Sequence, residues 1–466
     1  RTESRAGHDG PESVAEPRRV ATIPRHPQPG ETFEIRSPNG HPSYTHYLFR
    51  FPAKFHPPVV SWALDSYGRP GMAVLDPFTG SGTVQVEALV RGMSSVGVDI
   101  DPLACYLTRA KTTPLAPDGL SAAFERIERR LAPFTRGPAE LARLKTRDLT
   151  EEQFAESIGS LVYPRIPNLN HWFRRYVVVD LARLLWAVEA SELRPAVDRF
   201  FRACIASIIR RVSNADPYPV SALEVSRVQA SVNQERVIDV YGSFRDRLPR
   251  HIEAMASLYG KWRSMPGRPE ARAVCGDTAG LSGVLEAAGI RDGLRLVVTS
   301  PPYCTAVNYS RRHKLEMYWL GFVGSRQEHV DLSHAYLGRR WVRIKDWDAC
   351  PEFGIKGRDG TLAQIEARTR ARARALRHYF WSMSRAFGEI GAVMAPGATL
   401  ICATGDSVSC GTEVKTTQFL SELAADRFAL KNHFSYVVRN RYMQYPLRNG
   451  RGIRKEHILV LVRRPT

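Results

Sequence analysis

A glycine-containing turn that follows an apolar segment carries the strongest chemical signal in the chain. The turn Asp76-Pro77-Phe78-Thr79-Gly80-Ser81-Gly82-Thr83 comes directly after the apolar run 72–75. Glycine lets the backbone adopt positive φ and approach a ligand closely, and doubly wound sheets bind ligands at the carboxyl ends of their strands. A dinucleotide-binding loop would need a third glycine where Gln85 stands, and a P-loop would need Gly-Lys-Ser/Thr, which is absent. The turn therefore predicts a cofactor site and disfavours phosphate binding.

An acidic residue, Asp99, ends the next apolar segment, 94–99. In doubly wound folds, an acidic residue at about this separation in sequence from the glycine turn accepts hydrogen bonds from ribose hydroxyls. A solvent-exposed aspartate at a strand end is the alternative interpretation. Because Asp76 and Asp99 flank the glycine turn as a pair, the sequence favours a ligand site.

A second segment, Thr299-Ser300-Pro301-Pro302-Tyr303, also follows an apolar run. Two successive prolines hold the backbone extended and remove two N–H donors, so the carbonyl groups around them are free to accept hydrogen bonds from an amino group of a ligand. The segment thus holds a hydroxyl, a carbonyl and an aromatic face together. Standing alone, it would more readily be an ordinary Pro-Pro turn beside a packed tyrosine.

Both segments need a parallel sheet to position them. Short apolar runs bounded by turn residues predict strands, and apolar residues at helical spacing predict helices. The expected strands are 72–75, 94–99, 271–277, 294–299, 398–403, 433–438 and 457–462, and the expected helices around them are 58–67, 84–91, 363–394 and 416–426. This order predicts an α/β fold with a doubly wound, Rossmann-like sheet. The glycine turn and the Pro-Pro segment must then meet at one edge of that sheet.

The chain divides into parts of different composition. Residues 1–43 lack apolar periodicity and are expected to form a flexible tail, whereas 44–112 carry the glycine turn and 269–466 carry the Pro-Pro segment. Residues 113–268 show helical periodicity, which predicts a mainly helical inserted domain for target recognition. A smaller insertion without clear period is expected at 321–362.

The overall composition is basic: Lys and Arg outnumber Asp and Glu by 66 to 47, which gives a net charge of +19. This excess suits a polyanionic partner such as nucleic acid, although an Arg-rich composition also follows from a GC-rich genome. The seven cysteines form no CxxC pair, so we expect no zinc site, no other metal and no disulfide framework. No apolar run approaches the roughly 18 residues that span a bilayer. The expectation is a cytoplasmic protein of bacterial or archaeal type, associated with the nucleoid and not with a membrane.

In combination, the glycine turn and the Ser-Pro-Pro-Tyr segment resemble the cofactor loop and the catalytic loop of the DNA amino-methyltransferases, the restriction-modification type enzymes that methylate cytosine N4 or adenine N6. The resemblance covers residues 44–112 and 271–464. Ser-Pro-Pro-Tyr is more typical of the cytosine-N4 enzymes, and Asp- or Asn-Pro-Pro-Tyr of the adenine-N6 enzymes. The resemblance implies a class I methyltransferase fold, S-adenosyl-L-methionine as cofactor, DNA as partner and cytosine N4 as the favoured target. A cognate restriction or defence nuclease is a further candidate partner.

The resemblance also implies roles for individual residues. Lys54 and Phe55 lie in a segment similar to the one that covers the methionine end of the cofactor. Phe78 resembles the aromatic residue that touches the sulfonium, Asp99 the ribose acceptor, and Asp277 the residue beside the adenine. The remaining residues of the implied cofactor site are Asp76, Pro77, Gly80, Gly82 and Thr83. The alternatives are an exposed structural lysine for Lys54, core packing for Phe55 and a helix N-cap for Asp277.

Methyl transfer from a sulfonium is an in-line displacement, which requires positioning and electrostatic fit. The implied catalytic residues are Ser300, Pro301, Pro302 and Tyr303. Ser300 and the Pro301 carbonyl are expected to accept hydrogen bonds from the amino hydrogens of the target base, and Tyr303 is expected to stack on that base. Since the amino nitrogen cannot meet the cofactor inside a duplex, the base is expected to flip into a pocket between Gly80 and Tyr303.

The large insertion departs from the usual layout of this family, because it separates the strand that ends at Asp99 from the strand that ends at Asp277. Within it, 168–175 and 210–214 mix arginines with aromatic and amide side chains, which suits contacts with phosphates and base edges. The residues expected to bind DNA are Arg174, Arg175, Arg210 and Arg211. Solvated helix ends and packed aromatic residues are the alternative interpretation of these two segments. The Arg-rich run 368–377 could also contact DNA phosphates, and a solvated basic face is the alternative there.

Three other functions fit part of the pattern: an adenine-N6 DNA methyltransferase, an RNA base methyltransferase, and a DNA-binding protein whose catalytic core has decayed. An N-terminal RNA-binding domain would favour the second, but only a short segment expected to be unstructured precedes Tyr44. The intact glycine turn and Ser-Pro-Pro-Tyr segment argue against the third.

Overall fold

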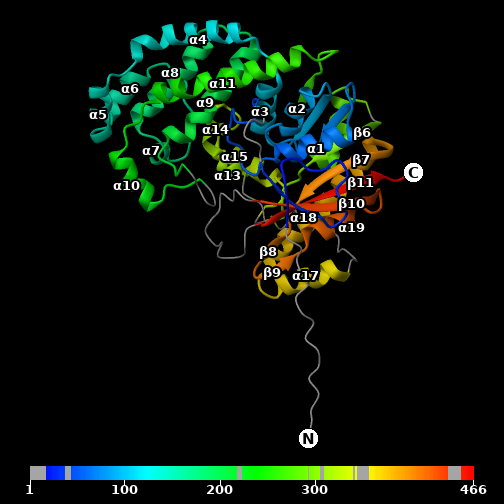
Figure 1. Ribbon diagram of the computed structural model, residues 1–466. Coiled ribbons are helices and arrows are strands. Elements are labelled where there is room, and N and C mark those ends of the chain that lie inside the picture. The colour runs from blue at the N-terminus through cyan, green and yellow to red at the C-terminus, as the bar shows by residue number, and fades with distance from the viewer. Residues whose placement is uncertain are drawn as a thin grey trace.

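The computed structural model describes residues 17–36, 44–217, 223–291, 293–304, 309–339, 342–343, 356–438 and 453–465. Its centre is a mixed sheet of nine strands in the order β1-β2-β10-β11-β7-β6-β3-β4-β5 (Figure 1). The strands are β1 (Arg18–Val20), β2 (Thr32–Ile35), β3 (Ala73–Asp76), β4 (Ser94–Asp99), β5 (Ala271–Cys275), β6 (Leu294–Thr299), β7 (Met394–Thr404), β10 (Phe428–Val437) and β11 (Lys455–Arg463).

The strand order identifies the fold. β3 pairs in parallel with β4 on one side and with β6 on the other, and β5 and β7 continue the parallel sheet outward. The chain therefore builds the sheet in two directions from a switch point between β3 and β6, as in doubly wound, Rossmann-like folds. β11 is inserted antiparallel between β7 and β10, which completes the class I methyltransferase arrangement. The predicted fold class is confirmed.

The parallel strands are apolar on both faces because helices cover both faces. Successive residues of a strand point to opposite sides, so Val74 packs in the layer of α1 (Pro57–Tyr67), whereas Leu75 packs in the layer of α18 (Arg370–Val393). The other helices next to the sheet are α2 (Thr83–Leu89), α3 (Pro102–Thr112), η2 (Thr278–Gly280), α12 (Leu281–Ala287) and α19 (Thr416–Ala424).

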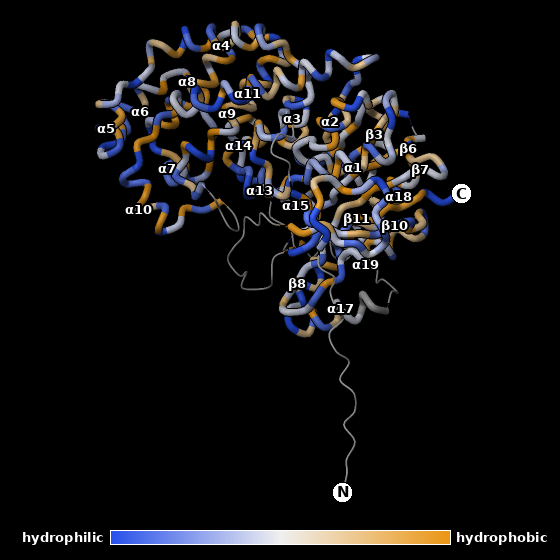
Figure 2. Tube along the Cα trace, in the orientation of Figure 1, coloured by the Kyte–Doolittle hydropathy of each residue, from blue (hydrophilic) through white to orange (hydrophobic). Residues whose placement is uncertain are grey.

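A helical lobe extends to one side of the sheet (Figure 1). It is formed by η1 (Ala132–Phe134) and by α4 (Pro117–Leu131), α5 (Pro138–Thr146), α6 (Glu151–Ile158), α7 (Leu169–Trp172), α8 (Arg175–Glu189), α9 (Pro195–Val212), α10 (Arg227–Glu235) and α11 (Val240–Arg263). Apolar and hydrophilic residues alternate along these helices (Figure 2), and the apolar residues form one buried cluster that includes Leu103 and Leu107 of α3. The helical content expected for 113–268 is present, and the shared cluster attaches the lobe to the sheet.

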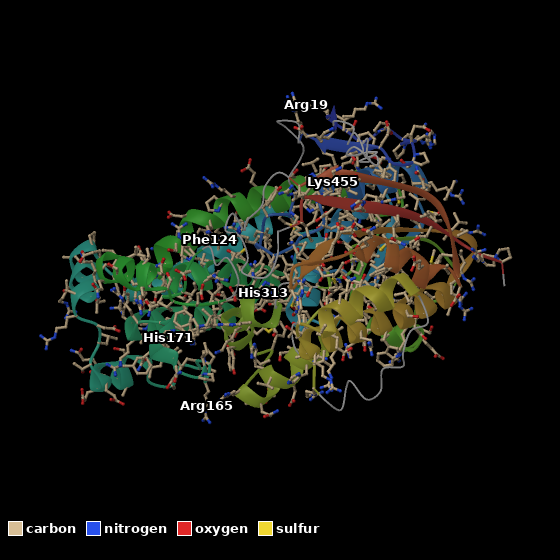
Figure 3. The ribbon with its side chains drawn as sticks, turned by 90° about the horizontal axis from the view of Figure 1, so that it is seen from below. Arg19, Phe124, Arg165, His171, His313 and Lys455 are labelled. Carbon is tan, nitrogen blue, oxygen red and sulfur yellow. The ribbon has the colours of Figure 1, made fainter. Side chains whose placement is uncertain are left out.

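Three helices connect the lobe with the Pro-Pro segment: α13 (Tyr309–Arg312), α14 (Lys314–Trp319) and α15 (Arg326–Ala335). Trp319 packs edge-on against Phe173 of the lobe, with 5.8 Å between the ring centroids. In Figure 3, His313 lies at this junction, between the lobe and the sheet.

The expectation of a flexible tail over 1–43 is wrong for its described part. β1 and β2 pair in parallel, and β2 adds to the sheet beside β10. Phe33 is fully buried against Phe434, with 5.8 Å between their ring centroids, and Trp62 donates a hydrogen bond to the carbonyl of Pro24. The strands have only three and four residues, too few for an apolar period to show in a segment rich in Pro, Arg and Gly.

Two expectations for the segment after 320 also need correction. The insertion 321–362 contains the regular helix α15, whose N-cap Ser325 accepts a hydrogen bond from the backbone N–H of Glu328. The single helix expected at 363–394 is two helices, α17 (Lys356–Glu366) and α18, because Thr369 is extended at the start of α18. The small hairpin of β8 (Ser407–Ser409) and β9 (Thr412–Val414) was not expected.

Across the described part of the chain, no helix combines the length and the apolar composition that crossing a bilayer requires.

Replacing Phe33 by Ala tests the attachment of the N-terminal strands. The change removes a fully buried ring that packs on Phe434, so we expect the free energy of unfolding to fall by about 3–5 kcal/mol, measured by urea titration. Leu430→Ala is the control, because Leu430 lies in β10 but is half exposed. Equal stabilities of the two variants would contradict the packing of β2 against the sheet.

Candidate active site

The glycine turn after β3 and the Pro-Pro segment after β6 lie at the same edge of the sheet. β3 and β6 are adjacent parallel strands, and the Thr299 hydroxyl donates a hydrogen bond of 2.7 Å to Oδ1 of Asp76. Gly80, Ser300 and Pro302 line one pocket of about 820 Å³, a volume that includes its open mouth. Residues of both segments thus face the same pocket, and both can contact ligands bound in it.

Most of the residues expected to bind the cofactor line this pocket. The expected lining residues are Lys54, Phe55, Asp76, Phe78, Gly80, Thr83, Asp99 and Asp277. Pro77 and Gly82 belong to the same turn but do not line the pocket. The lining residues that the sequence analysis missed are Phe51, Ala53, Thr79, Ser81, Ile100, Asp101, Thr278, Tyr309, Ala335, Tyr336 and Leu337.

The glycine turn wraps around the carboxylate of Asp99. Gly80 has a φ of +50° and donates its N–H to Oδ2 of Asp99 at 2.8 Å, while the N–H of Asp101 donates to Oδ1 at 2.9 Å. Gly82 has a φ of +78°, and a Cβ there would lie 2.8 Å from the side chain of Thr108. Thr108 in turn donates a hydrogen bond to the carbonyl of Gly80. Glycine at position 82 is therefore required by both conformation and space.

Four carboxyl groups line the pocket, and two of them, Asp76 and Asp99, end neighbouring strands. Asp76 is buried, and its Oδ1 accepts hydrogen bonds from Thr299 and from the N–H of Phe78. Burial raises the pKa of Asp76 to about 7, and burial together with the charge of Asp101 raises the pKa of Asp99 to about 7. Burial thus favours the neutral form of both carboxyl groups, and a cation bound beside them would favour the ionised form.

Lys54 lines the pocket, and a second lysine, Lys111, contacts the glycine turn. Lys54 donates a hydrogen bond to the carbonyl of His46 and lies 4.1 Å from the centroid of the Tyr47 ring, so it is not a free surface lysine. Burial lowers the pKa of Lys54 to about 8. Lys111 is fully buried and donates to the carbonyl of Ser81, and burial and the nearby Lys54 lower its pKa. Lys111 was missed, although it falls on the apolar face of a helix, four residues after Leu107.

A buried network fixes the segment that carries Lys54. Nε2 of His46 lies 2.6 Å from Oε1 of Glu87, whose other oxygen accepts from Ser61 and from Arg91. Burial alone would raise the pKa of Glu87, but the hydrogen bond from His46 and the charge of Arg91 hold it at about 2. Burial lowers the pKa of His46 to about 4, so its neutral ring donates to the Glu87 carboxylate. Sequence reasoning did not identify this network.

Asp277 caps a short helix and also lines the pocket, and its contact with a cofactor adenine stays a prediction. It caps η2 by accepting the N–H of Ala279 at 2.9 Å. The neighbouring Thr278 donates its hydroxyl to the carbonyl of Pro77, which joins the turn after β5 to the glycine turn. Phe55 likewise packs in the core and lines the pocket.

The Pro-Pro segment is supported from β11. The Tyr303 hydroxyl donates to Oε1 of Glu456 at 2.7 Å, and the hydroxyl of Tyr436 also hydrogen-bonds Glu456. Burial raises the pKa of Glu456 and that of Tyr303. Ser300 and Pro302 line the pocket, whereas Pro301 and Tyr303 stand outside its lining. Glu456 was missed; its only signal was a polar residue next to the apolar run 457–462.

An aromatic wall closes another side of the pocket. Phe51 stacks on Tyr309 with 6.1 Å between their centroids and an interplanar angle of 24°, and both rings line the pocket with Phe78. The His313 ring lies behind Phe51 at 4.7 Å. In the described part of the chain, no three His, Cys, Asp or Glu side chains gather as they would around a metal ion.

The arginines expected to bind DNA differ in their surroundings. Arg174 donates to backbone carbonyls that include that of Lys145, and Arg175 donates to the carbonyl of Leu149. Arg210 donates through Nε to the carbonyl of Asp216, and Arg211 is exposed. Internal carbonyls thus already hold three of the four, and their contact with DNA stays a prediction.

The Arg-rich run 368–377 lies against the small hairpin of β8 and β9. Arg372 donates to the hydroxyl of Ser409, and Arg368 hydrogen-bonds the carbonyl of Cys410. These contacts give part of the run a structural role.

Two curated relatives are type II methyltransferases. The chain is 25% identical over 249 residues to the type II methyltransferase M.MvaI of Kocuria varians, a match that covers 53% of the chain and 50% of M.MvaI. It is 32% identical over 79 residues to the type II methyltransferase M.MjaII of Methanocaldococcus jannaschii, covering 17% of the chain and 15% of M.MjaII. The chain therefore spans at most about half the length of these relatives. No model of a known protein family matches it.

Two solved structures are similar at a lower level. TrmN from Thermus thermophilus is 10% identical with a TM-score of 0.29, covering 88% of the chain and 49% of TrmN. The rRNA methyltransferase aviRa from Streptomyces viridochromogenes is 11% identical with a TM-score of 0.30, covering 89% of the chain and 88% of aviRa. The fold follows from the strand order of the sheet.

Replacing Asp76 by Asn tests the raised pKa of this carboxyl. The folded chain holds a proton on Asp76 up to about pH 7, whereas the unfolded chain releases it near the ordinary value of 3.8. The resulting stability is fully present below about pH 4 and is lost as the pH rises through about 7. Between about pH 6 and about pH 8, the free energy of unfolding should therefore fall by about 1 kcal/mol more in the parent than in the variant.

An amide oxygen can keep both hydrogen bonds that Asp76 accepts, since both go to Oδ1. Asp118→Asn, an exposed position in α4, is the control and should follow the parent. If Asp76→Asn also followed the parent, the raised pKa would be wrong.

Proposed function

We propose that the chain is an S-adenosyl-L-methionine-dependent DNA methyltransferase that acts on the exocyclic amino nitrogen of a flipped base, with cytosine N4 as the target. The observation that carries the proposal is the convergence of the glycine turn, Asp99 and Ser300 on one pocket at the switch point of the sheet. The similarity to two type II methyltransferases supports the same reaction class.

The residues of the pocket fit this cofactor. Asp99 can accept hydrogen bonds from the ribose hydroxyls and Asp277 from the adenine amino group. Phe78 offers an aromatic face to the sulfonium, and the carboxyl groups of Asp76 and Asp99 add an attractive field for a cation. Lys54 suits the carboxylate of the methionine moiety. When bound, S-adenosyl-L-methionine supplies an electrophilic methyl group.

The Pro-Pro segment would orient the nucleophile. An exocyclic amine is a weak nucleophile because its lone pair is delocalised into the ring. Acceptors that bind its two hydrogens would orient the nitrogen lone pair toward the methyl group. Ser300 lines the pocket, and in the proposed reaction its hydroxyl and the Pro301 carbonyl accept hydrogen bonds from the amino group. Tyr303 would present its ring to the base while Glu456 holds its hydroxyl.

The choice of cytosine depends on Ser300. In the family that the chain resembles, serine at this position is more typical of cytosine-N4 enzymes. A hydroxyl is also smaller than the Asp or Asn side chain typical of adenine-N6 enzymes. Adenine N6 is the alternative outcome of the experiment that follows.

We expect nucleoside mass spectrometry to find N4-methylcytosine in DNA from cells that express the chain and little of it with the Ser300→Ala variant. In vitro, losing one preorganised acceptor should lower kcat by about 100-fold with radiolabelled cofactor and unmethylated plasmid DNA. Ser160→Ala, at an exposed position of the lobe, is the control. Detection of N6-methyladenine instead would identify adenine as the target base. Methylated nucleosides in RNA but not in DNA would contradict the proposal.

A second expected outcome concerns the cofactor turn. Gly82→Ala and Gly71→Ala both place Ala at positive φ, but only the Cβ at position 82 meets Thr108 and so disturbs the bond to the Gly80 carbonyl. We expect Gly82→Ala to weaken S-adenosyl-L-methionine binding by about tenfold or more in calorimetry, which corresponds to about 1.4 kcal/mol. Gly71→Ala should bind like the parent. Equal affinities would exclude this turn as the cofactor site.

A further inference from the structure

Two cysteines from distant parts of the sequence meet beside the pocket. Cys105 lies in the first turn of α3, and Cys275 is the last residue of β5. Val274 packs in the layer of α18, so Cys275, the next residue of the strand, points to the opposite face of the sheet. α3 contacts β5 from that face. Both side chains therefore lie on the α3 side of the sheet.

Backbone carbonyl groups locate the two sulfur atoms. Sγ of Cys105 lies 3.4 Å from the carbonyl oxygen of Val274, which belongs to the peptide group that enters Cys275, and 3.5 Å from that of Asp99. Sγ of Cys275 lies 3.7 Å from the carbonyl oxygen of Ile100. Asp99 and Cys275 are register partners in the paired strands β4 and β5. The two thiols thus sit at the same two strand ends, where they are hydrogen-bonded to each other.

The helix is held against the strand one turn further on. Arg109 follows Cys105 by four residues, which places both on the same side of α3. Its Nε and Nη2 donate to the carbonyl of Ala273 at 3.0 and 2.7 Å. These two bonds fix α3 along the edge of β5, so the two thiols are kept together in the reduced chain.

The two thiols differ in exposure and in acidity. Cys105 is buried, whereas Cys275 is exposed. The hydrogen bond from Cys105 lowers the pKa of Cys275, and the same bond together with burial raises the pKa of Cys105. Partial burial, Asp99 and Asp101 oppose the shift at Cys275, and Arg109 adds to it. Cysteines that are oxidised reversibly are accessible, have thiolate character and lie next to a second thiol.

We propose that Cys105 and Cys275 form a site of reversible oxidation by peroxides, at which a disulfide closes beside the pocket. The Cys275 thiolate attacks one oxygen of hydrogen peroxide, the O–O bond breaks, and the hydroxide that leaves takes up a proton to become water. The Cys105 sulfur then attacks the sulfur of the resulting sulfenic acid, the S–O bond breaks, and the hydroxyl leaves as water with the proton of Cys105. Two thiols and one peroxide thus give one disulfide and two waters, and a dithiol reductant reverses the change.

The disulfide would act on the pocket from two directions. Covalently bonded sulfur atoms lie closer together than hydrogen-bonded ones, so oxidation draws the end of β5 and the start of α3 toward each other. Asp277, two residues after Cys275, lines the pocket. Thr108, three residues after Cys105, holds the carbonyl of Gly80. Oxidation therefore displaces both borders of the pocket and should weaken ligand binding. The identity of that ligand rests on the proposed function.

Peptide mapping after peroxide treatment tests the site. In the purified chain, we expect hydrogen peroxide to produce a cross-linked peptide pair that contains Cys105 and Cys275 and that separates on reduction with dithiothreitol. Cys275→Ser should form no such pair, and Cys105→Ser should leave Cys275 as a sulfenic acid that dimedone traps. Cys410→Ser is the matched control: it removes another partly exposed thiol, whose Sγ lies 3.8 Å from the Thr369 hydroxyl, and it should cross-link like the parent.

Calorimetry with S-adenosyl-L-methionine tests the effect on the pocket. Because a binding constellation must be held to within a fraction of an ångström, we expect the oxidised parent to bind about tenfold more weakly than the reduced parent. Dithiothreitol should restore the affinity, and peroxide treatment of Cys275→Ser should leave it unchanged.

The outcomes separate this inference from the proposed function. A parent that yields no cross-linked pair, or in which Cys275 is oxidised only to a sulfinic acid, would overturn the site. A cross-link that leaves the affinity unchanged would overturn its effect on the pocket. If the reduced parent binds no S-adenosyl-L-methionine, the proposed function fails, whereas the peptide map still decides whether the disulfide forms. Cys275 is exposed, so its variant tests the site even if Cys105→Ser does not fold.

Discussion

The hydrogen bond from Thr299 to Asp76 joins the two halves of the candidate active site. The two residues are 223 positions apart, and the whole lobe lies between them in the sequence. They meet because β3 and β6 are neighbours at the switch point, where the loops that follow two adjacent strands leave the sheet in different directions and a crevice opens. In this crevice the glycine turn approaches Asp99 from one strand, and Ser300 enters from the other. The chemistry at the pocket depends on this pairing of strands more than on any one side chain.

Acidic and basic side chains both lie at the pocket. Asp76 and Asp99 end two neighbouring strands and line the pocket with Lys54, and Lys111 of α3 donates to a carbonyl of the glycine turn. Burying these groups is costly, and their shifted pKa values reflect that cost. A ligand that carries both a cation and a carboxylate would lower the electrostatic energy of the acidic and of the basic groups, and so would offset part of this cost.

The strands and the two loops could be predicted because each has a local signal. An apolar run that ends in Asp or Ser is visible in the sequence, and parallel strands buried on both faces require such runs. The contacts that support the loops have no such signal. Glu456 holds Tyr303 from a strand more than 150 residues away, and only the sheet order brings the two together. The short β1 and β2 could not be predicted for a related reason: the pairing of β1 with β2 and of β2 with β10 supplies the stability that three or four residues cannot supply.

The lobe is attached to the pocket through α3. This helix begins at Pro102, and its N-cap is Asp101, two residues after the Asp99 that accepts the N–H of Gly80. Its apolar face, with Leu103 and Leu107, belongs to the cluster that fills the lobe, while Thr108 and Lys111 hold carbonyls of the glycine turn. Because one helix carries both sets of contacts, a rotation of the lobe would move α3 and with it the turn. Close packing leaves little room for such a rotation without strain, so the position of the lobe and the geometry of the turn are coupled.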